Sequence, residues 1–170
     1  MSTVHVMIAL VAVTGGLWDL RTRRIPNYLT FGCTVLAFAY ALVTGGWPGL
    51  GTSAAGWVVG FLLFLPFFLL RGMGGGDVKL LAALGAWFGP AGMLVLAFYT
   101  AMAGGVIALG VVLARGYFST AFKNLWLLLC HWSVIGLKPV PEISLENPRA
   151  PRLPYGVAIA VGALTTLWLE

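Results

Sequence analysis

The chain consists of long apolar runs separated by short polar or glycine-rich segments. The runs do not alternate apolar and polar residues as transmembrane β-strands do, so the pattern predicts α-helices rather than a barrel. A membrane-spanning helix needs about 20 apolar residues, and several runs approach that length. We therefore predict an all-α membrane protein of about six transmembrane helices in one bundle. The predicted spans cover residues 4–18, 28–43, 53–70, 77–87, 91–114 and 155–169.

The stretch between the fifth and sixth predicted spans is more polar. Lys123 and Asn124 interrupt residues 117–137, which favours an amphipathic helix in the membrane interface; a seventh span is the alternative. Residues 138–154 contain five prolines and two glutamates, which indicates an extended, solvated loop. The sequence contains no internal repeat, and we expect residues 1–170 to form a single transmembrane domain.

Composition supports a membrane protein and excludes an ordinary soluble domain. Of the 170 residues, 60% are hydrophobic and 9% are charged, whereas soluble domains carry roughly 25% charged residues. Cys33 and Cys130 form no CxxC pair, which argues against a structural metal site or a disulfide framework. The first apolar run has no basic segment before it, so we interpret it as a retained span rather than a cleaved signal peptide.

The net charge is +5, and the positions of the basic residues relative to the predicted spans indicate the topology. In a six-span bundle all ten lysines and arginines fall on one side, because the opposite turns at residues 44–52 and 88–90 contain none. The positive-inside rule makes that side cytoplasmic and both termini periplasmic. A seventh span would move the cations of residues 138–152 to the periplasmic side, against the rule, which is why we prefer six spans.

The two aspartates of the chain, Asp19 and Asp77, fall at the same depth in this topology. Asp19 follows the first span, the next two spans form a hairpin, and Asp77 opens the fourth span on the same side. Ionisable groups at membrane depth are costly and indicate a function by default. Two facing carboxylates can share one proton, so one can activate water while the other protonates a leaving group, as peptide hydrolysis requires.

Each aspartate also has a simpler interpretation. Asp19 would be a surface charge paired with Arg23, and Asp77 would be the N-cap of the fourth span. For the whole protein, the alternative function is a small proton- or cation-coupled membrane transporter that uses both aspartates, although such sites lie near the bilayer midplane. A non-catalytic assembly factor is a third interpretation, against which the intact aspartate pair argues.

A glycine-rich segment, residues 72–76, precedes Asp77. Glycine permits positive φ and close backbone approach, so this segment would give an extended peptide access to the carboxylate. The residues expected to shape that approach are Gly74, Gly75 and Gly76. The alternative is a flexible turn between two spans, and no GK[ST] sequence follows to support phosphate binding.

Two long motifs resemble those of the type IV prepilin peptidases, a family of GxGD aspartic peptidases. GGGDVKLL at residues 74–81 resembles the second aspartate motif of that family, and DLRTRRIPN at residues 19–27 resembles the first. PYGVA at residues 154–158 is similar to the opening of the family's last helix. The resemblance implies a membrane aspartic endopeptidase with Asp19 and Asp77 as the catalytic pair.

Within that family the chain is most similar to the short Tad/Cpa-type members. Longer members carry a cytoplasmic domain with paired CxxC motifs linked to N-methylation, and no such motif occurs here, so methyltransferase activity is not carried over. The resemblance implies cleavage of the basic leader of Flp/Tad-type prepilins and pseudopilins at the cytoplasmic face of the bacterial inner membrane, without cofactor or metal. Anionic lipids are the other expected partners, nucleic acid is not expected, and the oligomeric state is left open.

Residues beside the aspartates have expected supporting roles. Pro26 would fix the exit from the basic loop, and Asn27 would be the N-cap of the second span. Lys79 would pair with a carboxylate or with lipid, and both alternatives remain open. Three arginines are expected at anionic lipid headgroups rather than at the basic substrate leader: Arg21, Arg23 and Arg24.

Overall fold

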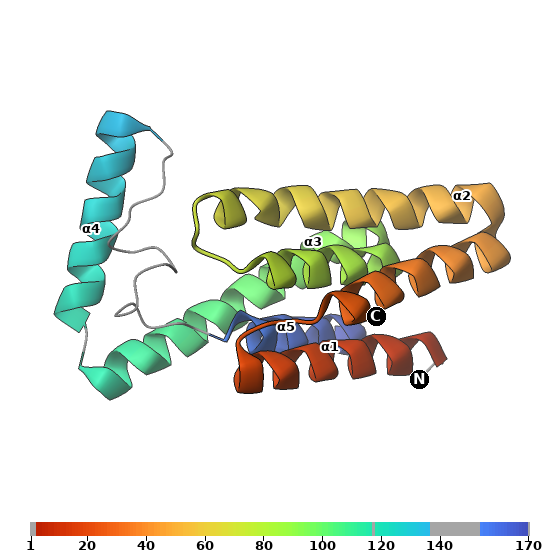
Figure 1. Cartoon of the computed structure of the whole chain (residues 1–170), viewed down its shortest axis with the longest axis horizontal. Coiled ribbons are helices and arrows are strands. Elements are labelled where there is room, and N and C mark those ends of the chain that lie inside the picture. Colours follow the sequence, from red (N-terminus) through yellow and green to blue (C-terminus); the bar gives the residue numbers. More distant parts are fainter. Residues whose placement is uncertain (1–2, 117, 137–153, 170) are drawn as a thin grey trace.

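The computed structural model describes residues 3–116, 118–136 and 154–169, and every regular element in these ranges is an α-helix (Figure 1). The all-α fold class is therefore confirmed for the described residues. The helices, in chain order, are α1 (Thr3–Thr22), α2 (Asn27–Leu69), α3 (Gly75–Arg115), α4 (Phe118–Ile135) and α5 (Tyr155–Leu169). Apart from Pro154, the loop predicted over residues 138–154 lies outside the described part of the chain.

Helices α2 and α3 are each too long for a single membrane crossing. They contain 43 and 41 residues, or roughly 60 Å of helix each, about twice the hydrocarbon thickness of a bilayer. Each helix has one interior residue with non-helical backbone angles: Gly46 (φ 60°, ψ −152°) in α2 and Gly89 (φ 68°, ψ 179°) in α3. Residues with a side chain rarely adopt such positive φ angles, so glycine is needed at both breaks.

The two breaks divide each long helix into two arms. Pro48 and Pro90 lie shortly after the breaks, and proline is well tolerated in the first turn of a new helical segment. Figure 1 shows α2 doubling back on itself after its first arm. The turn predicted over residues 44–52 is wrong in extent, because helix continues on both sides of Gly46. The arms comprise residues 27–45 and 47–69 of α2, and residues 75–88 and 90–115 of α3.

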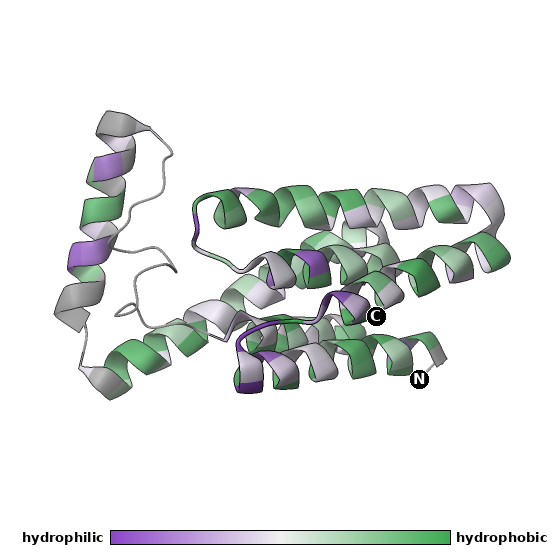
Figure 2. Cartoon of the chain, in the orientation of Figure 1, coloured by the Kyte–Doolittle hydropathy of each residue, from purple (hydrophilic) through white to green (hydrophobic). Residues whose placement is uncertain are grey.

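Three of the helices, α1, α2 and α3, are long and apolar enough to cross a membrane, and α5 is a shorter apolar helix. Figure 2 shows apolar residues along most of their length. Hydrophilic residues gather in the connections from α1 to α2 and from α2 to α3, and also occur along α4. The chain is a membrane protein, with its polar connections near the starts of α2 and α3.

Helix α3 lies at the centre of the bundle, where it packs against both α2 and α5. Its first arm supplies Leu80, Leu81 and Leu84, all with an exposed fraction of 0%. The closest approach to α2 is at Gly56 and Gly85, where a Cβ atom on either glycine would meet the backbone carbonyl of the other. Helices in lipid associate through small residues because hydrophobic burial no longer drives them together. The lack of a side chain at Gly56 and Gly85 therefore lets α2 and α3 pack closely.

Helix α4 stands apart from the other helices (Figure 1). Within the described part of the chain it contacts only α3. Its residues, Phe118–Ile135, match the helix predicted over residues 117–137, so that prediction is confirmed as to secondary structure. The interfacial position of this helix stays a prediction.

Candidate active site

Two buried aspartates lie near each other, one close to the end of α1 and the other at the start of α3. Asp19 lies about one turn before the end of α1, and Asp77 lies in the first turn of α3. Their exposed fractions are 6% and 8%, and the two carboxyl groups interact electrostatically. The tertiary structure thus brings together the two residues that the predicted topology had placed at one end of the bundle.

The carboxyl group of Asp19 is bound by the first turn of α5. Its Oδ2 atom accepts a hydrogen bond from the backbone N–H of Gly156 at 2.9 Å. The first N–H groups of a helix have no partner inside the helix, and the positive end of the helix dipole favours a negative group there. The interpretation of Asp19 as a surface charge is wrong, because its side chain is buried against α5.

Two glycines let α1 and α5 approach closely enough for this hydrogen bond. A Cβ atom on Gly156 would lie only 2.6 Å from the Cβ atom of Asp19. One turn earlier in α1, a Cβ atom on Gly16 would lie 3.0 Å from the carbonyl oxygen of Gly156 and 3.1 Å from the Cβ atom of Ala160. Both glycines are therefore required by the packing around Asp19, and neither could be replaced without moving a helix.

Asp77 is fixed by the start of its own helix. Its Oδ2 atom accepts a hydrogen bond from the backbone N–H of Gly74 at 3.2 Å, and its own N–H donates to the carbonyl of Gly74 at 3.1 Å. Gly74 is the N-cap of α3, and Asp77 is the third helical residue, in the capping-box position. The prediction that Asp77 is itself the N-cap is wrong by three residues, because the helix begins earlier, at Gly75.

The glycine-rich segment packs tightly against the chain itself. A Cβ atom on Gly76 would lie 3.1 Å from the Cβ atom of Ile25, and one on Gly75 would lie 3.2 Å from the ring of Phe68. None of the three glycines predicted to shape substrate approach adopts a positive φ angle, so the expectation of unusual backbone angles is not met. Glycine suits positions 75 and 76 because the Cβ atom of a larger residue there would crowd Phe68 or Ile25.

Two of the predicted supporting residues, Asn27 and Lys79, link α2 to α3. Lys79 Nζ donates a hydrogen bond to Asn27 Oδ1 at 2.9 Å. Pro26, with φ −65° and ψ 138°, is the N-cap residue of α2, and Asn27 is the first helical residue. The prediction that Asn27 is the N-cap is therefore wrong, since its side-chain oxygen accepts from Lys79 instead. The partner of Lys79 is an amide, which was neither of the two alternatives considered.

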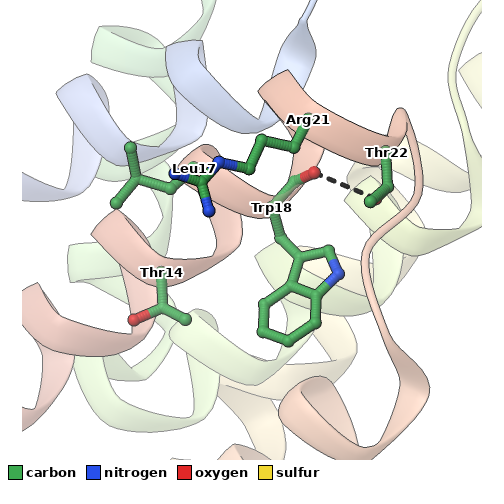
Figure 3. Close-up of a pocket in the computed structure, with 5 residues that line it drawn as sticks. All are labelled: Thr14, Leu17, Trp18, Arg21 and Thr22. Carbon is green, nitrogen blue, oxygen red and sulfur yellow. Dashed lines mark hydrogen bonds between the residues drawn. The ribbon is translucent and has the colours of Figure 1, made fainter.

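The basic residues at the end of α1 and in the loop after it are exposed, whereas the two aspartates are buried. All three predicted lipid-facing arginines, Arg21, Arg23 and Arg24, are exposed. Arg21 contributes to an open pocket of about 440 Å³ on one face of α1 (Figure 3). Figure 3 shows the lining residues: Thr14, Leu17, Trp18, Arg21 and Thr22. The hydroxyl of Thr22 donates to the carbonyl oxygen of Trp18 at 2.9 Å, which ties down the end of the helix.

Tyr155 and Gly156 belong to the site, although the sequence pattern predicted no chemical role for either residue beyond the family motif at residues 154–158. Tyr155 is partly buried against the core and interacts electrostatically with Asp77. It also lines a cavity of about 350 Å³ together with Met73, which lies just before the glycine-rich segment. The first turn of α5 therefore touches the surroundings of both aspartates. The feature of the sequence that could have indicated this role is the tyrosine–glycine pair at the start of the last apolar run.

This arrangement supplies a pair of carboxyl groups with restricted geometry and little solvent. Each accepts a backbone hydrogen bond, from α5 for Asp19 and from the N-cap of α3 for Asp77. When two carboxyl groups interact in a buried site, one can carry a proton while the other is ionised. Such a pair can act as a general acid and a general base in the same reaction.

The chain is similar to one family of known proteins. Residues 6–109 match the family model described as the type IV leader peptidase family. A prepilin leader peptidase/N-methyltransferase of Aeromonas salmonicida strain A449 is 33% identical over 119 residues, which cover 66% of this chain and 39% of that protein. The protein of the same name from Neisseria gonorrhoeae is 36% identical over 105 residues, covering 58% of this chain and 36% of the relative. The chain thus spans about two fifths of the length of these relatives. No solved structure matches it.

Proposed function

Because the chain belongs to the type IV leader peptidase family, we propose that it is a membrane aspartic endopeptidase that removes the basic leader peptide from Flp/Tad-type prepilins and pseudopilins. The observation that carries the proposal is the burial of Asp19 and Asp77 close enough to interact electrostatically, with a backbone N–H bound to each carboxyl group. The names of the relatives, which are prepilin leader peptidases, support the substrate class.

In the proposed reaction one carboxyl group is ionised and the other is protonated at the start. The ionised group takes a proton from a water molecule, whose oxygen attacks the scissile carbonyl carbon, while the protonated group gives its proton to the carbonyl oxygen. In the second step the intermediate returns a hydroxyl proton to one carboxylate, the C–N bond breaks, and the other carboxyl group protonates the leaving amine. The pair ends with one proton, as it began, and no covalent intermediate forms.

Access to the pair is proposed to follow the glycine-rich segment. Gly74 forms the N-cap hydrogen bond to Asp77, so this backbone lies directly beside one of the two carboxyl groups. A side chain at position 74 would cover this group, because its Cβ atom would lie 2.9 Å from Asp77 Oδ2. An extended substrate backbone could then lie along the segment with its scissile carbonyl between the aspartates.

The proposal includes the membrane topology predicted from the sequence. With the breaks at Gly46 and Gly89, α2 and α3 supply two spans each, and α1 and α5 supply one each. An even number of spans puts both termini on one side of the bilayer. By the positive-inside rule the aspartates lie at the cytoplasmic face of the bacterial inner membrane and the termini are periplasmic. The exposed basic loop then lies among anionic headgroups, and α4 lies in the interface.

The decisive experiment is co-expression of the chain with a full-length prepilin, followed by N-terminal sequencing of the pilin product. A new N-terminus directly after the basic leader supports the proposed function. An unprocessed prepilin, together with a proton or cation flux into vesicles that contain the chain, would instead support the transporter alternative. The position of Asp19 and Asp77 at helix ends rather than in the middle of a helix arm favours the peptidase.

A further inference from the structure

A further groove lies beside the start of α2, on a part of the molecule that the proposed chemistry does not use. It has a volume of about 550 Å³ and is open to the side. Both arms of α2 and the first arm of α3 contribute to its wall, which is mostly apolar. The lining residues are Asn27, Thr30, Phe31, Thr34, Phe38, Trp57 and Lys79.

One end of the groove carries a positive charge. Lys79 is exposed and is the one charged residue among the described residues that line the groove. Its Nζ atom donates to Asn27 Oδ1 at 2.9 Å, which holds the ammonium group at the start of α2. An ammonium group has three donors, so two remain for an anionic ligand. This end of the groove is therefore suited to an anion such as a phosphate.

The rest of the groove is lined by aromatic side chains and offers little hydrogen bonding. Phe31 has an exposed fraction of 72%, so this ring does not serve the core of the bundle. Trp57, from the second arm of α2, stacks on Phe61 with ring centroids 5.3 Å apart. The hydroxyl of Thr34 donates to the backbone carbonyl of Thr30 at 2.9 Å, so that donor is used inside the helix. This part suits an apolar chain.

The length of the groove matches one leaflet of a bilayer. Asn27 and Phe38 lie eleven residues apart on the same helix arm, which corresponds to about 16 Å of helix. Half of a hydrocarbon core is about 15 Å. A ligand with its charge at Asn27 and Lys79 would therefore place an acyl chain alongside Phe38, within the same leaflet.

We propose that this groove binds one anionic glycerophospholipid, with its phosphate on Lys79 and one acyl chain between Phe31, Phe38 and Trp57. A soluble anion would use only the charged end, and an uncharged or zwitterionic lipid would leave the lysine poorly matched. A basic substrate leader is a poor match for this groove, because its charge has the same sign as that of Lys79. Lipid charge and groove charge are complementary, because anionic lipids attract basic groups at the membrane surface.

This site is separate from the aspartate pair. Lys79 follows Asp77 by two residues, and residues two apart on a helix point to different faces. Asp77 turns toward Asp19 and α5, whereas Lys79 turns toward Asn27 at the start of α2. The lipid would brace the first turn of α3 from outside, and the proposal stands whether or not the chain is a peptidase.

The test uses the full chain, purified in detergent, depleted of lipid and studied by native mass spectrometry. It is titrated with phosphatidylglycerol and, separately, with phosphatidylcholine carrying the same acyl chains. We expect one phosphatidylglycerol to bind per chain, and Lys79→Gln to weaken that binding about tenfold, which corresponds to the loss of one charge-assisted hydrogen bond. Phe31→Ala should also weaken it, because the acyl chain loses an aromatic wall.

Lys123→Gln is the matched control, since it makes the same change at an exposed lysine that is not among the residues that line the groove. Equal losses in Lys79→Gln and Lys123→Gln would show diffuse attraction to a basic surface and overturn the proposal. Equal binding of phosphatidylcholine by the unaltered chain would overturn it as well, and this result needs no folded variant. Displacement of the lipid by glycerol phosphate at similar concentration would identify a soluble anion as the ligand and also overturn it.

Discussion

The backbone N–H of Gly156 donates a hydrogen bond of 2.9 Å to the Asp19 carboxyl group, although the two residues are 137 positions apart in the chain. The bond joins the first described helix to the last. It leaves the Asp19 carboxyl group little freedom to rotate, and the absence of a side chain at position 156 is what makes the distance possible. The position of one proposed catalytic group therefore depends on a helix that carries neither aspartate.

We predict that Gly156→Ala lowers prepilin cleavage by about 100-fold while the protein still inserts, because a displacement near 1 Å at a catalytic group can have that effect. The added Cβ atom would lie 2.6 Å from the Cβ atom of Asp19, so α1 and α5 must move apart. The measurement is kcat for leader removal from a purified prepilin, with the amount of folded enzyme determined independently.

Gly110→Ala is the matched control for this variant. It makes the same substitution at a helical glycine whose added Cβ atom would meet nothing within 4 Å. We expect its activity to equal that of the unaltered chain. If Gly156→Ala cleaves as fast as Gly110→Ala, α5 does not position Asp19.

For the aspartates themselves, we predict that Asp19→Asn and Asp77→Asn each abolish leader cleavage. Asparagine has nearly the same size but is neither an acid nor a base under these conditions. The double variant should be no worse than either single one, because residues that act as a unit give non-additive losses. Processing is measured by the gel shift of a full-length prepilin in membranes that contain each variant.

Expression and membrane insertion of these variants serve as the control, and both should match the unaltered chain. Asp19→Glu and Asp77→Glu should also lose nearly all activity, since an added methylene moves the carboxyl group by about an ångström. Full processing by either asparagine variant would eliminate the aspartic mechanism, whatever the family membership implies.

At the glycine-rich segment, we predict that Gly76→Val abolishes cleavage. The valine Cβ atom would lie 3.1 Å from the Cβ atom of Ile25 and 3.3 Å from its backbone nitrogen and oxygen atoms. The branched methyl groups need still more room, so the first turn of α3, with Asp77, must shift away from the loop before α2. Cleavage and thermal unfolding of the purified variant are measured together.

Gly32→Val provides the comparison, because it has the same cost in helix propensity at a helical position with nothing within 4 Å of the added Cβ atom. We expect it to remain active. Normal activity in Gly76→Val would mean that the contact with Ile25 is not needed to hold Asp77 in place.

The topology can be tested with reporter fusions along the chain. Fusions after Arg24, Arg71 and Arg115 should report the cytoplasm, and a fusion after Gly46 should report the periplasm. The break in α2 at Gly46 lies between two arms that each approach the length of a bilayer core. A cytoplasmic signal at Gly46 would contradict the hairpin that returns the chain to the side of Asp19 before Asp77.

Much of the helical fold could be predicted from the sequence because hydrophobicity along a chain is a local property. The apolar runs marked the helices, and counting the runs between Asp19 and Asp77 placed both residues at one end of the bundle. The helix starts were predicted less well. Asn27 and Asp77 were each assigned as N-caps from their residue type, whereas Pro26 and Gly74 hold those positions. Residue preference at a helix end is a weak guide, because Asn27 accepts from Lys79 of another helix and Asp77 caps its own helix from the third position.

The sequence by itself determined that this chain is a helical membrane protein with two aspartates on one side. It also contained the motifs that indicate the family. Only the tertiary structure decided that Gly156 holds Asp19 and that Lys79 reaches Asn27. Both contacts join residues from separate helices, and the first forms only because Gly16 and Gly156 let α1 and α5 come close. That fit depends on the packing of the whole bundle, which no local pattern encodes.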